Sequence, residues 1–396
     1  MKKLWISFIL MIALYIFAFP ISTLSARAET QAEIEASIEE EVNNYLDNLD
    51  LSEFERFLSE SNAPSEIKSP SIKDVVGKIV KGDIPLDFGK MLSYIGSQAV
   101  GVLTGTLAAL LTVMILAVMS SIMSGLTSGF VKKQTIEIVH YVFYALVVSI
   151  VLVRVGGIVQ ECRDFTKGVN TFTEGVFPPL ITLMSALGGS VSASVYKPQL
   201  ALFALVMSNV FGKVILPLFI AAIAFCLISN LSSSVKMDKF QSAIRYSSTL
   251  ILSCLFGLFI TYLTVAGITG GMVDGVSIKA AKFVLSSYVP ILGGYLSQGF
   301  DLISAGCVLI KNAIGVLGIL SVLFLVMRPI LHITIFSFSL KIVASLIQPI
   351  GDKRISDFLY SVSNATKILV TSIVGTGFVL IVTLLLMVVT CNVGVI

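Results

Sequence analysis

Long apolar segments constrain this chain most, because a helix needs about 20 consecutive apolar residues to cross the hydrocarbon core of a bilayer. Six such segments follow residue 90, and each contains few or no charges. They are residues 98–126, 136–159, 200–229, 248–268, 330–347 and 366–390. Charged residues make up only 13% of the 396 residues, which is too little polar surface to cover a water-soluble globule. The sequence therefore predicts an all-α, polytopic membrane protein.

Three further apolar segments are interrupted. Residues 177–195 contain two prolines and two glycines, residues 283–300 contain Pro290 and two glycines, and Lys311 interrupts residues 302–327. Interrupted backbone is tolerated at membrane depth only where protein or a water-filled cavity surrounds it. Each of these segments is therefore compatible with a re-entrant hairpin, an interfacial helix or a complete span.

The first residues have the layout of a secretory signal. Two lysines follow Met1, an apolar run covers residues 4–19, and an Ala-Arg-Ala cleavage site ends at Ala28. This pattern predicts a signal peptide over residues 1–28. The alternative is an uncleaved first transmembrane helix. Under either interpretation the positive end stays inside, so the region that follows residue 28 lies outside the cytoplasm.

That following region, residues 29–90, is acidic, with 15 acidic and 6 basic residues and a net charge of −9. Capping boxes beginning at Thr30 and Ser52, and a helix start at Ser71, predict a small helical extracytoplasmic region. Its apolar stripes fit a small core, a face resting on the membrane or a partner surface. Residues 91–396 carry a net charge of +9, but these bases are scattered among apolar spans, and nothing indicates nucleic-acid binding.

The loops between spans predict the orientation. A loop over residues 161–174 is balanced in charge, whereas three other loops are basic. The basic loops contain Lys132 and Lys133; Lys236, Lys239 and Arg245; and Lys353, Arg354 and Lys367. The positive-inside rule puts these three loops in the cytoplasm. An even number of crossings then leaves the C-terminus outside, on the same side as the acidic region.

An internal repeat is suggested by Asp238-Lys239, which recurs as Asp352-Lys353 with matching Ser and Tyr residues downstream. We predict two parallel repeats, because both basic turns lie on the same side. The expected units are a first transmembrane helix pair, residues 91–170; repeat one, residues 171–280; and repeat two, residues 281–396. Paired interrupted segments point to a pathway or docking surface. The alternative is that Pro and Gly only let helices pack closely.

Ionisable groups near the spans are the candidate functional residues, because a charge in hydrocarbon costs roughly 3 kcal/mol on insertion scales. Arg328 and Lys341 are expected to snorkel to the interface. For Lys213 and Lys311, snorkelling and a polar cavity are both open. The candidate pathway or docking residues are Lys213, Asp274, Lys279, Lys282, Pro290, Asp301, Lys311 and Asn312.

No catalytic or metal-binding constellation is present in the sequence. Its two histidines, His140 and His332, fit packed or interfacial positions. The five cysteines form no C-x-x-C pair and fit buried apolar positions. There is no phosphate-binding P-loop, zinc-binding H-E-x-x-H or nucleophile-elbow motif. We therefore expect no enzymatic activity, no cofactor and no metal, and any ATPase would be a separate subunit.

Seven ordered stretches carry a resemblance to a known family. They are LDLSE at 49–53, GSVSA at 189–193, VDGVSIKAAKF at 273–283, VPILG at 289–293, DLISA at 301–305, LIKNAIGVLG at 309–318 and QPIG at 348–351. On these residues the chain resembles the stage III sporulation protein AE family of endospore-forming bacteria. The likeness covers nearly the whole chain, and Lys311 falls inside one of the stretches.

The resemblance implies a multi-pass protein of the mother-cell membrane around the forespore. It implies membership of a secretion-like channel that is needed after engulfment and for late forespore gene expression. Other membrane subunits, ring-forming subunits and an ATPase would be the partners, and the acidic region would face the space between the two membranes. The family supplies no catalytic residues. The residues alone also allow a secondary transporter of a small solute or an assembly scaffold without a pore.

Overall fold

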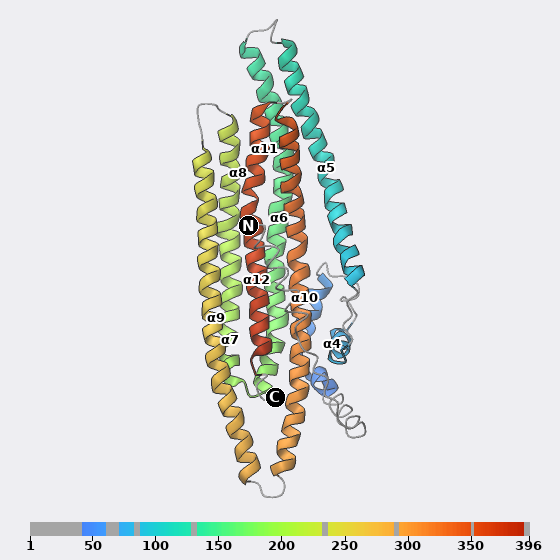
Figure 1. Ribbon diagram of the computed structural model, residues 1–396, viewed down its shortest axis with the longest axis vertical. Helices are drawn as coiled ribbons and strands as arrows, with labels where there is room; N and C mark the ends of the chain where they lie inside the picture. The colour runs from blue at the N-terminus through green and yellow to red at the C-terminus, as the bar shows by residue number, and fades with distance from the viewer. Residues whose placement is uncertain are drawn as a thin grey trace.

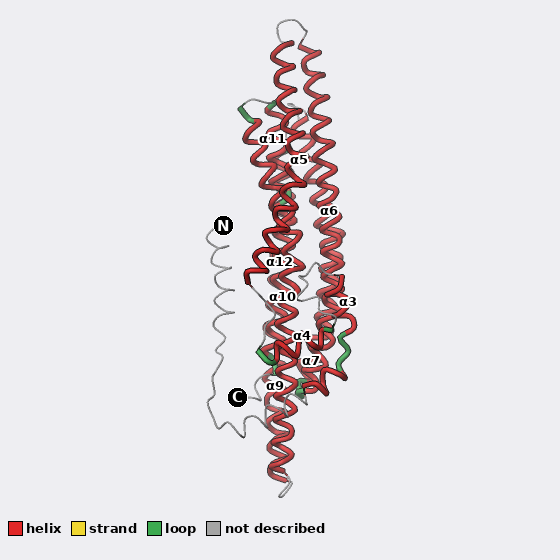
Figure 2. Tube along the Cα trace, turned by 90° about the vertical axis from the view of Figure 1, so that its right-hand side faces the viewer, coloured by secondary structure: helices red, strands yellow, loops and turns green. Residues whose placement is uncertain are grey.

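The computed structural model describes residues 42–60, 71–82, 88–127, 133–231, 237–288, 293–349 and 352–391. Every regular element within these residues is helical, as Figure 2 shows, and the all-α prediction is confirmed. The elements are α3 (Ser52–Glu60), α4 (Ile72–Val80), α5 (Phe88–Thr127), α6 (Lys133–Ala186), α7 (Ser190–Val210), the π-helix η1 (Phe211–Ile215), α8 (Leu216–Leu231), α9 (Asp238–Tyr288), α10 (Gly293–Ile347), α11 (Lys353–Ala365) and α12 (Lys367–Val389). Residues 42–48 are also helical.

Six helical segments are long and apolar enough to cross a membrane, and each overlaps one of the predicted spans. They are Gly89–Met123, Thr135–Ala186, Ser190–Leu231, Lys239–Ala280, Ile303–Ile347 and Lys353–Val389. The predicted multi-pass architecture is therefore confirmed at the level of six apolar helical segments.

These helices are longer than one bilayer requires. Helix α6 has 54 residues and α10 has 55. At 1.5 Å per residue each is about 80 Å long, whereas the hydrocarbon core is about 30 Å thick. Much of each helix therefore projects beyond the hydrocarbon.

The interrupted segments prove to be helix ends or uninterrupted helix. Helix α6 continues through Pro178 to Ala186, and a turn at Gly188 (φ +83°) leads into α7, so residues 177–195 form the tip of a helical hairpin. Residues 283–300 hold the adjoining ends of α9 and α10, with 289–292 outside the described residues. Lys311 lies within α10, so the prediction that it interrupts that segment is wrong.

The predicted loop over residues 161–174 is also wrong, because these residues lie inside α6. Their charges are solvated or paired along the helix instead of breaking it. Gln160 donates to Asp164 at 3.1 Å, and Lys167 lies 3.8 Å from the same carboxylate. Pairs spaced three or four residues apart stabilise an exposed helix, so a cluster of charges does not by itself mark a loop.

The helices form one elongated bundle in which α10 is central. Helix α10 packs against α5, α6, α9, α11 and α12. In Figure 1 the adjoining ends of α5 and α6, of α8 and α9, and of α10 and α11 lie towards the upper end, and the α6–α7 turn and the adjoining ends of α9 and α10 lie towards the lower end. The described residues of the three predicted basic loops lie in helices instead, since Lys133 begins α6, Lys239 and Arg245 lie in the first turns of α9, and Lys353 and Arg354 begin α11, with Lys367 at the start of α12. The starts of α6, α9 and α11 share one end of the bundle, opposite the C-terminal end of α12.

Helices α7, α8 and α10 each contain one proline, which are Pro198, Pro217 and Pro329. Pro217 follows η1, and Pro329 lies within α10. A proline lacks the amide hydrogen and crowds the carbonyl four residues earlier. The π-turn at Phe211–Ile215 accommodates this loss just before Pro217.

The segments compared in the predicted repeat have related positions. Asp238 is the first residue of α9, and Asp352 is the N-cap of α11, where its carboxylate accepts from the backbone N–H of Arg354 at 2.9 Å. Both follow an upward-running helix at the same end of the bundle. The proposed unit boundaries at 170 and 280 would divide α6 and α9 within the helix. The duplication remains a prediction.

Residues 42–48, α3 and α4 form a small unit, called here the acidic module, which lies against α6 and α10. Phe57 of α3 packs edge-on against Phe172 of α6, with ring centroids 5.3 Å apart. The absence of a side chain at Gly175 lets α3 approach closely, because a Cβ there would lie 2.9 Å from the carbonyl oxygen of Glu53. The helices predicted at Ser52 and Ser71 are thus present, and α3 docks on α6 whereas α4 docks on α10.

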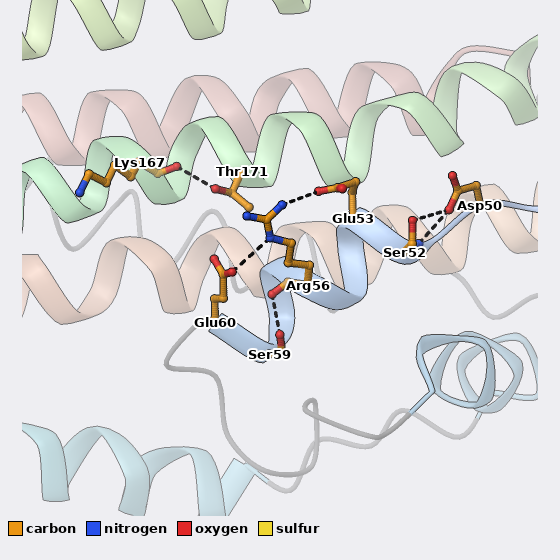
Figure 3. Close-up of polar contacts among 8 residues, drawn as sticks. All are labelled: Asp50, Ser52, Glu53, Arg56, Ser59, Glu60, Lys167 and Thr171. Carbon is orange, nitrogen blue, oxygen red and sulfur yellow. Dashed lines mark hydrogen bonds and ion pairs between the residues drawn. The ribbon is translucent and has the colours of Figure 1, made fainter.

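Capping in the acidic module differs from the predicted boxes. Ser52 is the first residue of α3, and the carboxylate of Asp50 accepts from both its backbone N–H (3.1 Å) and its hydroxyl (2.6 Å), which lowers the pKa of Asp50 (Figure 3). Glu55 instead accepts from the backbone N–H of Ile72 at the start of α4. The box predicted at Ser52 is therefore wrong, since Asp50 caps the start of α3 and Glu55 caps the start of the neighbouring helix α4. The box predicted at Thr30 lies outside the described residues.

Arg56 holds the exposed face of α3 together. Its guanidinium lies 3.2 Å from Glu60 and 3.6 Å from Glu53, and these carboxylates raise its pKa (Figure 3). Lys73 of α4 pairs with Asp47 at 3.2 Å. Exposed pairs of this kind contribute little individually, so the apolar contacts with α6 and α10 dominate docking.

Candidate functional site

Two fully buried charges lie at the lower end of the bundle in Figure 1, and each is satisfied by a helix terminus. Asp274 of α9 is 1% exposed. Its carboxylate accepts from the backbone N–H groups of Val191 at 3.0 Å and Ser192 at 2.8 Å, at the start of α7. A helix N-terminus presents free N–H groups and partial positive charge. Asp274 therefore caps α7 from the neighbouring helix.

Lys311 of α10 has no exposed surface. Its ammonium donates to the backbone carbonyl of Thr390, which follows the last turn of α12. A helix C-terminus presents free carbonyls and partial negative charge, so this is the favourable position for a cation. Lys311 does not snorkel. The carbonyl oxygen of the neighbouring Asn312 side chain is buried without a hydrogen bond among the described residues.

Asp274 and Lys311 both lie near Cys391. We call these two residues, together with Ser192, Tyr196 and Thr390, the polar layer. The hydroxyls of Tyr196 and Thr390 lie 3.4 Å apart, and the Thr390 hydroxyl also donates to the carbonyl of Leu386 at 2.7 Å. Four helices, α7, α9, α10 and α12, meet in this layer. The sequence identified both charges but not the backbone groups that satisfy them.

Small residues let the four helices approach at the polar layer. Gly270 of α9 faces Ser192, where a Cβ would lie 2.8 Å from the hydroxyl oxygen. Gly267 faces the Tyr196 hydroxyl, and Gly189 faces the sulfur of Cys391. Burial raises the pKa of the Cys391 thiol to about 11, with Lys311 lowering it and Asp274 raising it further. The thiol is therefore protonated and unreactive at neutral pH.

The other candidate residues do not join the polar layer. Lys213 is exposed within η1, and Lys279 is exposed on α9. Pro290 lies outside the described residues, as do the side chains of Lys282 and Asp301. Of the eight candidates, the structure thus places Asp274 and Lys311 in the polar layer, with Asn312 next to Lys311.

A second ionic group, not anticipated from the sequence, crosses from α6 to α10. The ring Nδ1 of His332 contacts the carboxylate of Glu161, and Arg328 lies 3.7 Å from the same side chain. Glu161 is only 16% exposed at its side chain. Arg328 and His332 are one helical turn apart, and this spacing was the feature of the sequence that could have indicated a shared acidic partner. Arg328 reaches a buried carboxylate while remaining half exposed.

A third group joins α5, α6 and α11 at the upper end in Figure 1. His140 of α6 lies 2.8 Å from the carboxylate of Asp352 and 3.2 Å from the hydroxyl of Ser120. Arg354 lies 3.7 Å from Glu137 and stacks over Tyr141 at 5.3 Å. Both histidines are therefore partly buried bridging groups. Among the described residues no three His, Cys, Asp or Glu side chains gather to hold a metal ion.

A groove of about 650 Å³ lies between α6 and α7. Its walls are mainly apolar, but Glu174 and Lys197 also line it. Asn170 bridges to Ser208 at 3.4 Å within the groove. The groove does not include the polar layer, so the buried charges face helix termini rather than an open cavity.

This arrangement defines a helical integral membrane protein whose buried charges fasten helices to one another. The family profile described as Stage III sporulation protein AE matches residues 70–391, and the chain belongs to that family. It is 20% identical over 215 residues to Stage III sporulation protein AE of Bacillus subtilis (strain 168), an alignment that covers 54% of each protein. No solved structure matches the chain. The predicted family and the predicted role in sporulation are confirmed.

Proposed function

We propose that this chain is a non-enzymatic membrane subunit of the channel that joins the mother cell to the engulfed forespore. It lies in the mother-cell membrane around the forespore and supports late forespore gene expression. Its partners are other membrane subunits, ring-forming subunits and a separate ATPase. Membership of the sporulation family and the six long apolar helices support this role.

The observation that carries the proposal is the length of the bundle. A self-sufficient carrier needs helices that cross about 30 Å of hydrocarbon, whereas α6 and α10 are each about 80 Å long. The surplus makes a rigid projection that bears the acidic module on one side. A projection of this kind suits a subunit that docks partners beyond the membrane surface.

The orientation follows from charge. The basic starts of α6, α9 and α11 lie at one end of the bundle in Figure 1, and the acidic module and the end of α12 lie towards the other. By the positive-inside rule the basic end faces the mother-cell cytoplasm. The acidic module, the α9–α10 hairpin and the C-terminus then face the space between the two membranes.

Complementation separates the channel subunit from a solute transporter. In an endospore-forming host that lacks its own family member, this chain should restore a late forespore reporter only when the partner subunits are present. The purified chain alone in liposomes should catalyse no solute flux. Flux by the purified chain, together with complementation that needs no partners, would support the transporter and contradict the proposal.

Shortening the α9–α10 hairpin tests the projection directly. Replacing residues 281–300 with a short Gly-Ser linker removes the tip and leaves every basic turn intact. We expect normal protein abundance in the membrane but loss of late forespore expression. The matched control shortens the α5–α6 turn at the opposite end by a comparable length. Equal reporter activity in the wild type and the tip-shortened variant would refute a docking role for the projection.

A further inference from the structure

Helix α9 presents a continuous apolar stripe on its exposed face. Residues spaced at helical intervals along it are between 50% and 74% exposed. They include Tyr246, Leu250, Leu258, Tyr262, Met272 and Val276. Exposed apolar side chains extend from Phe240 to Phe283, a length of about 65 Å along the helix. A bilayer is about 40–45 Å thick even with its headgroups, so lipid cannot cover the whole stripe.

The opposite edge of the molecule has a second uncovered apolar face. Helix α5 packs on α6 and α10, whereas α9 packs on α7, α8, α10 and α12, and the two helices lie on opposite sides in Figure 1. Leu92, Val100 and Ile115 of α5 are each more than half exposed. Gly101 and Gly105 form a G-x-x-x-G pair, and a Cβ added at either would meet nothing within 4 Å. Such a pair lets a second helix approach closely.

The exposed apolar faces of α5 and α9 overlap in their position along the long axis of the bundle. Tyr94 of α5 packs on Phe324 of α10, with ring centroids 6.0 Å apart. Phe256 of α9 packs on Gly375 of α12, and α10 and α12 contact each other nearby through Val326. Two copies placed side by side with parallel axes therefore bring the middle of α9 in one copy to the start of α5 in the next.

Charge is complementary at the lower end of the same two edges. Lys279 is exposed on the apolar face of α9, and Lys282 follows one turn later in the sequence. The opposite edge carries the acidic module, whose described residues, 42–60 and 71–82, hold six acidic and four basic side chains. A second copy thus supplies both an apolar face for α9 and carboxylates for Lys279. A lipid bilayer covers only part of this length.

We propose that α9 of one copy packs against α5 and the acidic module of the next copy. The two contacting faces differ, so the contact is head-to-tail. Such contacts repeat from copy to copy, and they form a ring where the rotation between copies closes and an open row where it does not. The interface does not depend on what the assembly transports or whether it transports anything.

Cysteine cross-linking tests this contact, because the chain already has a suitable thiol. Cys254 is exposed on the apolar face of α9, and Ser97 is exposed on α5 at a similar height. Ser97→Cys with a short bis-maleimide, applied to native membranes, should give a ladder of dimers, trimers and larger species. Ser97→Cys combined with Cys254→Ser should remain monomeric, as should the wild type. Thr112→Cys, on the same face of α5 but about 22 Å farther along, should cross-link at least tenfold less.

The outcomes distinguish three ways of covering the apolar stripe of α9: the α5 face of a second copy, a symmetric contact with a second copy, and lipid or another protein. Dimers that stop at two, formed by wild-type Cys254 alone or by Ser97→Cys without Cys254, would show a symmetric contact and overturn the head-to-tail interface. Monomer in every variant would show that lipid or another protein covers α9, and would also overturn it. Lys279→Glu should lower the ladder yield several-fold, whereas Lys239→Glu at the other end of α9 should not. Equal loss with both variants would contradict the charge pairing.

Discussion

Asp274→Ala should release the start of α7 from α9. The Asp274 carboxylate is the acceptor for the backbone N–H groups of Val191 and Ser192, at 3.0 and 2.8 Å. With Ala at this position the Ser192 N–H stays buried and the Val191 N–H stays partly buried, each without its acceptor. The α6–α7 turn follows directly, so we expect it to open more often while the rest of the bundle stays assembled.

The magnitude follows from the two lost acceptors. A buried donor left without a partner costs about 1–3 kcal/mol, so two cost about 2–6 kcal/mol in local stability. Since about 1.4 kcal/mol corresponds to a factor of ten, even the lower value raises the open population roughly 30-fold. Asp274→Asn keeps one carbonyl acceptor and most of the volume. It should therefore give an intermediate effect, which separates lost hydrogen bonds from a lost side chain.

Thiol labelling reads out this opening. Cys391 is 8% exposed, and its sulfur packs on Gly189 in the turn. In a Cys254→Ser background, maleimide modification of Cys391 is followed by mass spectrometry of the intact protein in detergent. We expect Asp274→Ala to label at least tenfold faster than the parent. Ser277→Ala, three residues along α9 at an exposed site, is the matched control. Labelling of Asp274→Ala within twofold of this control would refute the capping role.

Three further predictions concern the charged groups and the orientation. Lys311→Leu should impair sporulation after engulfment at normal protein level, because it leaves the Thr390 carbonyl without its cation; wild-type spore counts would reduce Lys311 to a packing role. Because burial raises the pKa of the Cys391 thiol to about 11, whereas the unfolded thiol ionises near 8.5, the folded state should lose stability as pH rises from about 9 towards 11; a Cys391→Ala variant whose denaturation midpoint falls by the same amount over this pH range would contradict this. A reporter enzyme fused after Ile396 should be active outside the cytoplasm, and activity inside would mean an odd number of crossings.

The spans were predictable because a long run of apolar residues indicates a segment that lies in lipid. Each predicted span overlaps one of the long helices, even where its exact ends differ. The true helix lengths were not predictable by the same rule. Residues 161–174 are helical despite their charges, because these charges pair along α6 or, at Glu161, with groups of α10. A composition rule for membrane spans therefore ends a helix too early wherever the helix continues into water.

The charges of the polar layer were recognisable, but their partners were not. Asp274 binds backbone groups 82 and 83 residues away, and Lys311 binds a carbonyl 79 residues away. A backbone N–H has no residue-type signature, so no spacing in the sequence could mark it as a partner. The pairing of Glu161 with His332 is similarly distant, at 171 residues. From the sequence we could infer only that burying each ionisable group is energetically costly.

The way these charges are satisfied limits where a passage through the assembly can lie. A polar passage needs groups that can exchange partners with whatever moves along it. Asp274 and Lys311 are at most 1% exposed and bound to the ends of α7 and α12, so ionic contact with a cargo would first uncap a helix. That uncapping costs several kcal/mol by the same reckoning used for Asp274→Ala. The polar layer therefore holds the helices of one copy together. We expect any passage to be lined by the surfaces of several copies rather than by the interior of one.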